Sequence, residues 1–175
     1  MSKKTKILLL SDDMRLHSGI ATMSKEIVLH TAHKYDWVQV GAAVKHPEEG
    51  KLFDVSDSVA AESGADNVNV KIIPFSGYGN PDLIRQLITT EQPDAILHFT
   101  DPRFWDWLYA MEDEIHGFGI PIMYYAIWDD LPDPDWNHTA YGSCDLIMGI
   151  SKQSYGIHHR VLEDNGATVI PLSNL

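Results

Sequence analysis

Short apolar runs alternate with amphipathic segments along most of this sequence of 175 residues. The runs have the length of buried strands, and the segments between them repeat apolar residues every three or four positions, as a helix with one buried face does. The predicted strands are residues 6–10, 37–44, 70–73, 95–99, 122–127, 146–150 and 168–171. The predicted helices are residues 19–34, 82–91, 103–116 and 151–164. This alternation predicts an α/β fold, a three-layer Rossmann-like domain around a mostly parallel sheet of six or seven strands.

The remaining pattern concerns connections and helix ends. Residues 46–66 are polar and weakly periodic, and we interpret them as a long excursion from the sheet. Ser151 is the expected N-cap of the last helix, and Asn165 with Gly166 its expected stop. No segment repeats, so we expect one domain over residues 1–175.

The charge and the cysteine count narrow the class of protein. A formal net charge of −12 argues against broad binding to nucleic acid, whose phosphates require clustered lysine and arginine. No apolar run approaches the roughly 20 residues that a membrane-spanning helix needs. Cys144 is the single cysteine, which excludes an internal disulfide and favours a reducing compartment, so we expect a cytoplasmic protein.

Ligands of open parallel sheets bind beyond the carboxyl ends of the strands, so the loops there are the expected sites of chemistry. Ser18 and Gly19 follow the first strand and open a helix. Gly19 lets a ligand approach the backbone, and the free N–H groups of a helix start attract phosphate. The glycine-rich dinucleotide and phosphate-loop motifs are absent. The alternative is that Ser18 only caps the helix.

A second polar group follows the strand at 95–99. Asp101 is placed to accept a hydroxyl proton or orient a sugar hydroxyl, and Arg103 to meet a phosphate or carboxylate. Thr100 and His98 complete this group. The alternatives are that Asp101 caps a helix with Pro102 at its first position, and that His98 is a satisfied core residue.

The third candidate loop, residues 128–136, is rich in carboxylates and flanked by tryptophans. Trp128 beside Asp129 suits a sugar, because an apolar sugar face stacks on indole while acids accept hydroxyl groups. The spacing is not that of a calcium EF-hand, and no metal site is predicted. A proline-rich acidic surface loop is the alternative.

Taken in order, several segments resemble the acceptor-side, N-terminal domain of family 4-like, B-fold glycosyltransferases. These segments are residues 18–21 after the first strand, residues 98–102 in place of the family's His-x-His-Glu-Pro, residues 122–128, residues 144–151 in place of Ala-Asp-x-Ile-x-x-x-Ser, and residues 169–171 before the family's interdomain linker.

The resemblance implies transfer of a sugar from a nucleotide-sugar donor to an unknown acceptor, with no other cofactor. The loop at Gly19 would face the donor diphosphate. Thr100 and Asp101 stand where the family often has its second histidine and glutamate, which leaves Asp101 and Asp129 as the candidate catalytic residues. Ser18, Gly19, His98, Thr100, Arg103 and Trp128 are the candidate substrate-binding residues.

The resemblance also implies that a C-terminal donor-binding domain is absent from these residues. We therefore expect the cleft to be covered by such a domain or by a homo-oligomer, and these residues alone to be inactive. Two further alternatives stay open. One is a catalytically inactive, scaffolding relative of the same fold. The other is a phosphoacceptor receiver domain, indicated by Asp12, Asp13 and Lys152.

Overall fold

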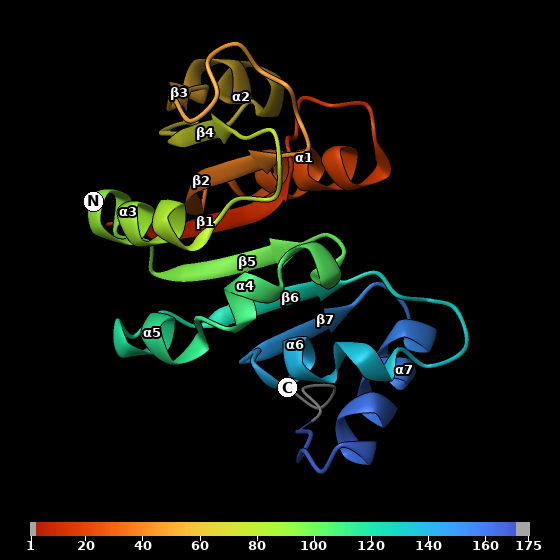
Figure 1. Ribbon diagram of the computed structural model, residues 1–175. Coiled ribbons are helices and arrows are strands. Elements are labelled where there is room, and N and C mark those ends of the chain that lie inside the picture. Colours follow the sequence, from red (N-terminus) through yellow and green to blue (C-terminus); the bar gives the residue numbers. More distant parts are fainter. Residues whose placement is uncertain (1–2, 171–175) are drawn as a thin grey trace.

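The computed structural model describes residues 3–170, which fold around one seven-stranded sheet flanked by helices (Figure 1). The strands are β1 (Thr5–Asp12), β2 (Tyr35–Ala42), β3 (Phe53–Asp54), β4 (Val70–Pro74), β5 (Ala95–Phe99), β6 (Ile122–Ala126) and β7 (Leu146–Gly149). Their order is β3-β4-β2-β1-β5-β6-β7, and every pair except β3/β4 is parallel. The predicted α/β class with a mostly parallel sheet is confirmed, and the order fits a Rossmann-like fold.

The helices connect the strands in the manner that parallel pairing requires. They are α1 (Gly19–Thr31), α2 (Ser56–Ser63), α3 (Pro81–Glu91), α4 (Asp106–Tyr109), α5 (Glu112–Gly117), α6 (His138–Gly142) and α7 (Lys152–Asp164). Two 3₁₀ turns, η1 (Pro102–Phe104) and η2 (Asp135–Asn137), precede α4 and α6. None of the helices in residues 3–170 has the length and apolarity that crossing a membrane demands.

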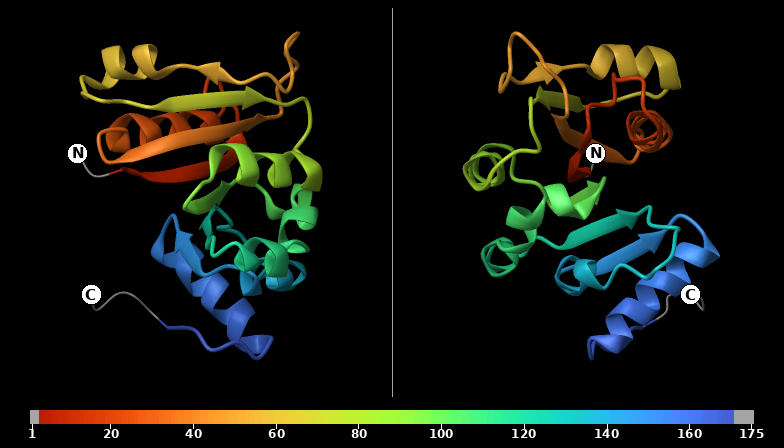
Figure 2. Two further views of the ribbon diagram at one scale, coloured as in Figure 1. Left: turned by 90° about the vertical axis from the view of Figure 1, so that its left-hand side faces the viewer. Right: turned by 45° about the vertical axis from the view of Figure 1, so that its right-hand side comes forward.

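Alternate residues of the central strand β1 enter two different hydrophobic clusters. Leu8 and Leu10 pack with buried residues of α3, α4 and α5. Ile7 and Leu9 pack with buried residues of α1 and α2. The right-hand view of Figure 2 shows α1 and α3 on opposite sides of the sheet. The apolar run of β1 is therefore continuous because both of its faces are covered.

The segment 46–66 is more regular than predicted. It contains β3, which pairs antiparallel with β4, and α2. Only Val59 of α2 is buried, so the helix has almost no apolar stripe that the sequence could reveal. The interpretation of 46–66 as a long excursion from the sheet therefore missed a strand that belongs to the sheet and a helix.

The predicted helix at 103–116 is broken into η1, α4 and α5. The backbone leaves helical geometry at Trp105 and at Met111, and both side chains are buried. The bends bring both side chains into the core, so packing overrides helical continuity here. The short elements η2 and α6 were not predicted at all.

The predicted strand at 168–171 is also wrong in its described part. Residues 167–170 form no strand, and Ile170 is 80% exposed; Pro171 lies outside the described residues. The seventh strand of the sheet is β3 instead. Both ends of α7 agree with the sequence: at its start Ser151 accepts a hydrogen bond from the Ser154 N–H at 3.1 Å, and after its end Gly166 has a φ of +82°.

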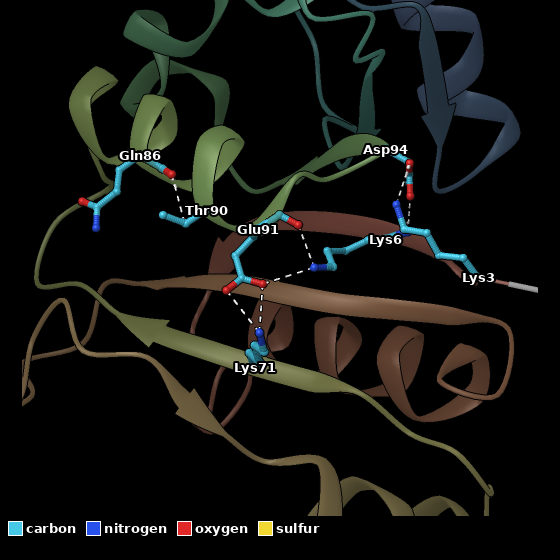
Figure 3. A network of polar contacts seen from close by, with 7 residues as sticks. All are labelled: Lys3, Lys6, Lys71, Gln86, Thr90, Glu91 and Asp94. Atoms are coloured by element: carbon cyan, nitrogen blue, oxygen red, sulfur yellow. Dashed lines mark hydrogen bonds and ion pairs between the residues drawn. The ribbon is translucent and has the colours of Figure 1, made fainter.

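An ion-pair cluster joins α3 to the amino ends of β1 and β4 (Figure 3). The Glu91 carboxylate lies 3.3 Å from Lys6 Nζ and 3.0 Å from Lys71 Nζ, and its side chain is only 10% exposed. Burial opposes ionisation of Glu91, but hydrogen bonds and charge from Lys71 and Lys6 outweigh it and lower the pKa. This cluster fixes α3 against the sheet at the end opposite the carboxyl-end loops.

We expect Glu91→Gln to lower the free energy of unfolding at pH 7 by about 1–3 kcal/mol, because it removes charge-assisted hydrogen bonds from a partly buried site. The folded pKa lies below the ordinary 4.5, so the contribution is complete above pH 4.5 and is lost as the pH falls through the folded value. Urea unfolding of the variant and the wild type at pH 7 and pH 3.5 measures the loss of stability and its dependence on pH. A variant as stable as the wild type at pH 7 would contradict the role given to this cluster.

Candidate functional site

The strand order reverses between β1 and β5, so the loops after these two strands diverge at the carboxyl edge of the sheet. Such a switch point is where open α/β sheets bind ligands. The loops at the switch point are β1–α1 and β5–η1. The loop β6–η2 follows the strand next to β5.

A buried polar network supports the β1–α1 loop. The Gln39 side-chain amide donates to Ser11 Oγ at 2.7 Å and to the Asp12 carbonyl at 2.9 Å, and it accepts from the Met14 N–H at 3.1 Å. Ser24 Oγ of α1 donates to Ser11 Oγ at 3.0 Å. Gln39, Ser11 and Ser24 are fully buried. Their hydrogen bonds fix where the chain leaves β1 and enters the loop.

Asp13 also stabilises the β1–α1 loop, through its contacts with Arg15. It is fully buried, and its carboxylate accepts from Arg15 Nε at 2.8 Å and from Arg15 Nη2 at 2.6 Å. A Cβ atom on Gly41 of β2 would lie 2.6 Å from Asp13 Oδ2, so only glycine fits beneath this carboxylate. Asp13 is thus held in an ion pair and is not exposed to solvent.

Ser18 and Gly19 begin α1. Ser18 Oγ accepts from the Ala21 N–H at 3.1 Å and donates to Asp12 Oδ2 at 3.2 Å, so the capping alternative holds for Ser18. Burial raises the pKa of Asp12, and the Ser18 hydrogen bond opposes this rise. No atom lies within 4 Å of a Cβ built on Gly19, which leaves this backbone open to approach.

These residues line a pocket of about 430 Å³, the α1 pocket. Its lining comes from the start of α1 and from the ends of β5, β6 and β7: Ser18, Gly19, Ile20, Met23, Phe99, Tyr125, Ile127 and Ile150. The walls are mostly apolar, with the helix N-terminus on one side.

A second pocket of about 340 Å³, the tryptophan pocket, lies beyond the ends of β5 and β6. It is lined by Asp101, Pro102, Tyr124, Ile127, Trp128, Asp129, Asp130 and Asn137. Ile127 lines both pockets, so they are neighbours. The structure therefore places Ser18 and Gly19 in one pocket and Asp101, Trp128 and Asp129 in the next.

Asp101 is engaged by Arg103. Its carboxylate accepts from the Arg103 N–H at 3.0 Å, caps η1, and meets Arg103 Nη2 at 2.5 Å. Burial raises the pKa of Asp101, but the hydrogen bonds and charge of Arg103 outweigh burial and lower it overall. The Arg103 guanidinium also lies 6.0 Å from the Trp128 ring centroid. Arg103 thus neutralises Asp101 at the rim of the pocket and does not line it.

His98 and Thr100 lie beneath the tryptophan pocket and line neither pocket. His98 is fully buried, its Nδ1 is 2.6 Å from the Tyr109 hydroxyl, and burial lowers its pKa to about 3. Its ring stacks on Tyr124, whose hydroxyl donates to the Thr100 carbonyl at 3.1 Å. His98 and Thr100 therefore position Tyr124, the residue that does line the pocket.

The acidic loop after β6 is ordered by its own contacts. Trp128 Nε1 donates to the Asp130 carbonyl at 2.8 Å, and Trp128 packs edge-on against Trp136 with centroids 5.6 Å apart. Asp133 is paired with Arg160 of α7 at 2.6 Å. Across residues 3–170, no three histidine, cysteine or acidic side chains are grouped closely enough to hold a metal ion.

The sequence analysis did not identify three residues that lie at or near the pockets. Asp12 is interpreted there as part of a receiver-like pair, yet it joins the α1 cap. Tyr124 belongs to an apolar strand, and its neighbours Met123 and Tyr125 are themselves partly buried and apolar or aromatic, so the sequence does not mark it out. Asn137 sits in an irregular segment and carries no signal, because η2 brings it into the tryptophan pocket.

The sequence matches no protein-family model, and no curated protein matches it.

Proposed function

We propose that this chain is a three-layer Rossmann-like domain of a glycosyltransferase that moves a sugar from a nucleotide-sugar donor to an acceptor. The observation that carries the proposal is the pair of neighbouring pockets at the carboxyl edge of the sheet, one beside the switch point and one beyond β5 and β6, which share Ile127. A transferase needs two ligands side by side, and this arrangement offers a separate pocket for each. The single cysteine favours a reducing compartment, in accord with a cytoplasmic enzyme.

The α1 pocket suits the donor. Free N–H groups at the start of a 13-residue helix favour a phosphate, and the absence of a side chain at Gly19 leaves room for it. Apolar lining residues such as Ile20, Met23 and Phe99 supply surface for the uncharged part of a donor.

The tryptophan pocket suits the acceptor. Trp128 offers a ring face, and Asp129 offers an exposed carboxylate that can accept a hydroxyl proton. Asp101 is a weaker base, because Arg103 holds it as an ion pair and lowers its pKa.

A second candidate is a catalytically inactive, binding or scaffolding relative. It is favoured by the engagement of Asp101 with Arg103 and by the complete burial of His98. In such a relative, Asp101 and His98 would stabilise the fold, and the pockets would bind ligands without catalysis.

A panel of nucleotide-sugars tests the donor pocket. We expect weak, millimolar-range binding of one or more of UDP-glucose, GDP-mannose and ADP-glucose, detected by ligand-observed NMR. Gly19→Val should reduce this binding by about 10-fold or more, because the added side chain projects into open space in the phosphate path without a clash that would unfold the protein.

The matched control is Gly117→Val, which also adds a side chain where no atom lies within 4 Å, but at the end of α5. It should bind donors like the wild type. Equal binding by Gly19→Val and the wild type, or no donor binding by the wild type, would contradict the assignment of the α1 pocket.

A further inference from the structure

We propose that the tryptophan pocket selects an acceptor that carries a protonated amine, such as an amino sugar. That the ligand is a sugar acceptor rests on the proposed function. The selection of an amine rests on the charge, the aromatic ring and the buried Asn137 amide of the pocket.

The pocket holds more negative than positive charge. Three carboxylates line it, those of Asp101, Asp129 and Asp130, and its lining includes no lysine, arginine or histidine. Arg103 pairs with Asp101. Within the described part of the chain, no ion pair involves Asp129 or Asp130, whereas nearby Asp133 is taken by Arg160. Two carboxylates at the pocket therefore lack a counter-charge that a ligand can supply.

Asp130 is held in a fixed relation to an aromatic ring. Its Oδ1 accepts from the Leu131 N–H at 2.8 Å, and its carbonyl accepts from Trp128 Nε1 at 2.8 Å. Trp128 and Asp130 both line the pocket, so a cation bound there could form a charge-assisted hydrogen bond with the carboxylate and a cation–π contact with the ring.

The lining of the pocket also includes an uncharged hydrogen-bond acceptor, the side-chain carbonyl of Asn137. Asn137 lines the pocket, is only 3% exposed, and donates through Nδ2 to the Tyr141 hydroxyl at 3.3 Å. Among residues 3–170, no donor meets its side-chain carbonyl. This carbonyl is not one of the buried side-chain atoms that lack a partner, so it stays accessible and can accept a hydrogen bond from an ammonium or hydroxyl group of a ligand.

These three features separate an amine from its competitors. An anionic acceptor would meet repulsion from Asp129 and Asp130. A neutral acceptor would form hydrogen bonds but leave both charges uncompensated. A sugar with a protonated amine satisfies the ring, the carboxylates and the Asn137 carbonyl together.

The test measures binding of matched probes to the chain at pH 7 and low salt, by tryptophan fluorescence and calorimetry. The probes are glucosamine, glucose, N-acetylglucosamine and methylammonium. We expect glucosamine to bind about 10-fold or more tightly than glucose or N-acetylglucosamine, and the preference to shrink as salt rises.

Asp130→Asn should remove most of this preference. Asp130 is exposed, so the substitution leaves the fold intact. Asp113→Asn makes the same change in charge at an exposed position of α5 and should keep the preference. Together the two variants separate a local effect of the pocket from the net charge of the protein.

The outcomes distinguish this inference from the proposed function. Equal binding of glucosamine and glucose overturns amine selection and leaves a sugar acceptor site in place. Binding of methylammonium as tight as that of glucosamine supports amine selection and overturns the sugar acceptor. A preference that survives Asp130→Asn, or binding of none of the probes, overturns the inference.

Discussion

Lowering the pH from 7 to 5 should reduce the free energy of unfolding by about 4 kcal/mol through two buried histidines, about 2 kcal/mol from each. His98 is fully buried and His158 is 3% exposed. Burial lowers the pKa of His98 to about 3, a shift that nearby Asp101 partly opposes, and burial lowers the pKa of His158 to about 4. Both rings are therefore neutral in the folded protein throughout this window.

The sign follows from proton binding. In the unfolded chain both rings titrate near the ordinary value of 6.5 and take up protons as the pH falls, while the folded protein takes up none until much lower pH. The contribution of the two histidines to the free energy of unfolding is complete above pH 6.5. It is lost progressively as the pH falls toward about 4 for His158 and about 3 for His98. Urea unfolding at fixed ionic strength, followed by tryptophan fluorescence, measures the difference.

His158→Phe separates the two contributions. Its ring contacts Tyr141 edge-on, and neither ring nitrogen has a hydrogen-bond partner in the described structure, so phenylalanine keeps the aromatic contact without leaving a partner unsatisfied. The variant should lose about half of the acid sensitivity. His33→Phe, at an exposed position for which no ion pair is found among residues 3–170, is the control and should behave like the wild type. A free energy of unfolding that stays constant between pH 7 and pH 5 would show that these rings are not the acid-sensitive groups.

Replacement of Asp129 should have the largest effect on turnover. Under the proposed function, and in a protein that also carries the expected donor-binding domain, Asp129→Asn should lower kcat in a sugar-transfer assay by about 10²–10⁴-fold, because it removes a carboxylate placed to take the acceptor proton. Asp101→Asn should lower kcat less, since Arg103 already engages Asp101 and lowers its pKa.

Two measurements keep this prediction specific. Circular dichroism should show that both variants are folded, and the loss in Asp129→Asn should fall on kcat with KM little changed. Transfer by Asp129→Asn at the wild-type rate would mean that this acid only fills a surface loop. A larger loss in Asp101→Asn would move the role of base to Asp101.

The sequence predicts the sheet well where burial is continuous. All five residues of β5 are buried, and the apolar run at 95–99 marks both of its ends correctly. The sequence fails where burial is sparse or packing bends the chain. The helix α2 buries only Val59, and the segment after β5 breaks at Trp105 and Met111 to bring both into the core. A periodicity argument detects neither event.

The positions of the candidate loops are predictable for a geometric reason, since each follows the carboxyl end of a parallel strand. Side-chain partners are not predictable in this way. The pairing of Asp101 with Arg103 depends on side-chain conformation, and the contribution of Asn137 depends on a 3₁₀ turn with no sequence signature. The sequence therefore indicates where ligands approach, and only the three-dimensional structure separates engaged from available polar groups.

Ile127 forms a wall of both pockets. Two molecules bound at once, one on each side of this isoleucine, would be held at a distance set by a single side chain. Their encounter would then resemble a step within one molecule, with a high effective molarity and no further loss of translational freedom. Under the proposed function, the size of residue 127 would thus help to set how closely the two reacting groups approach.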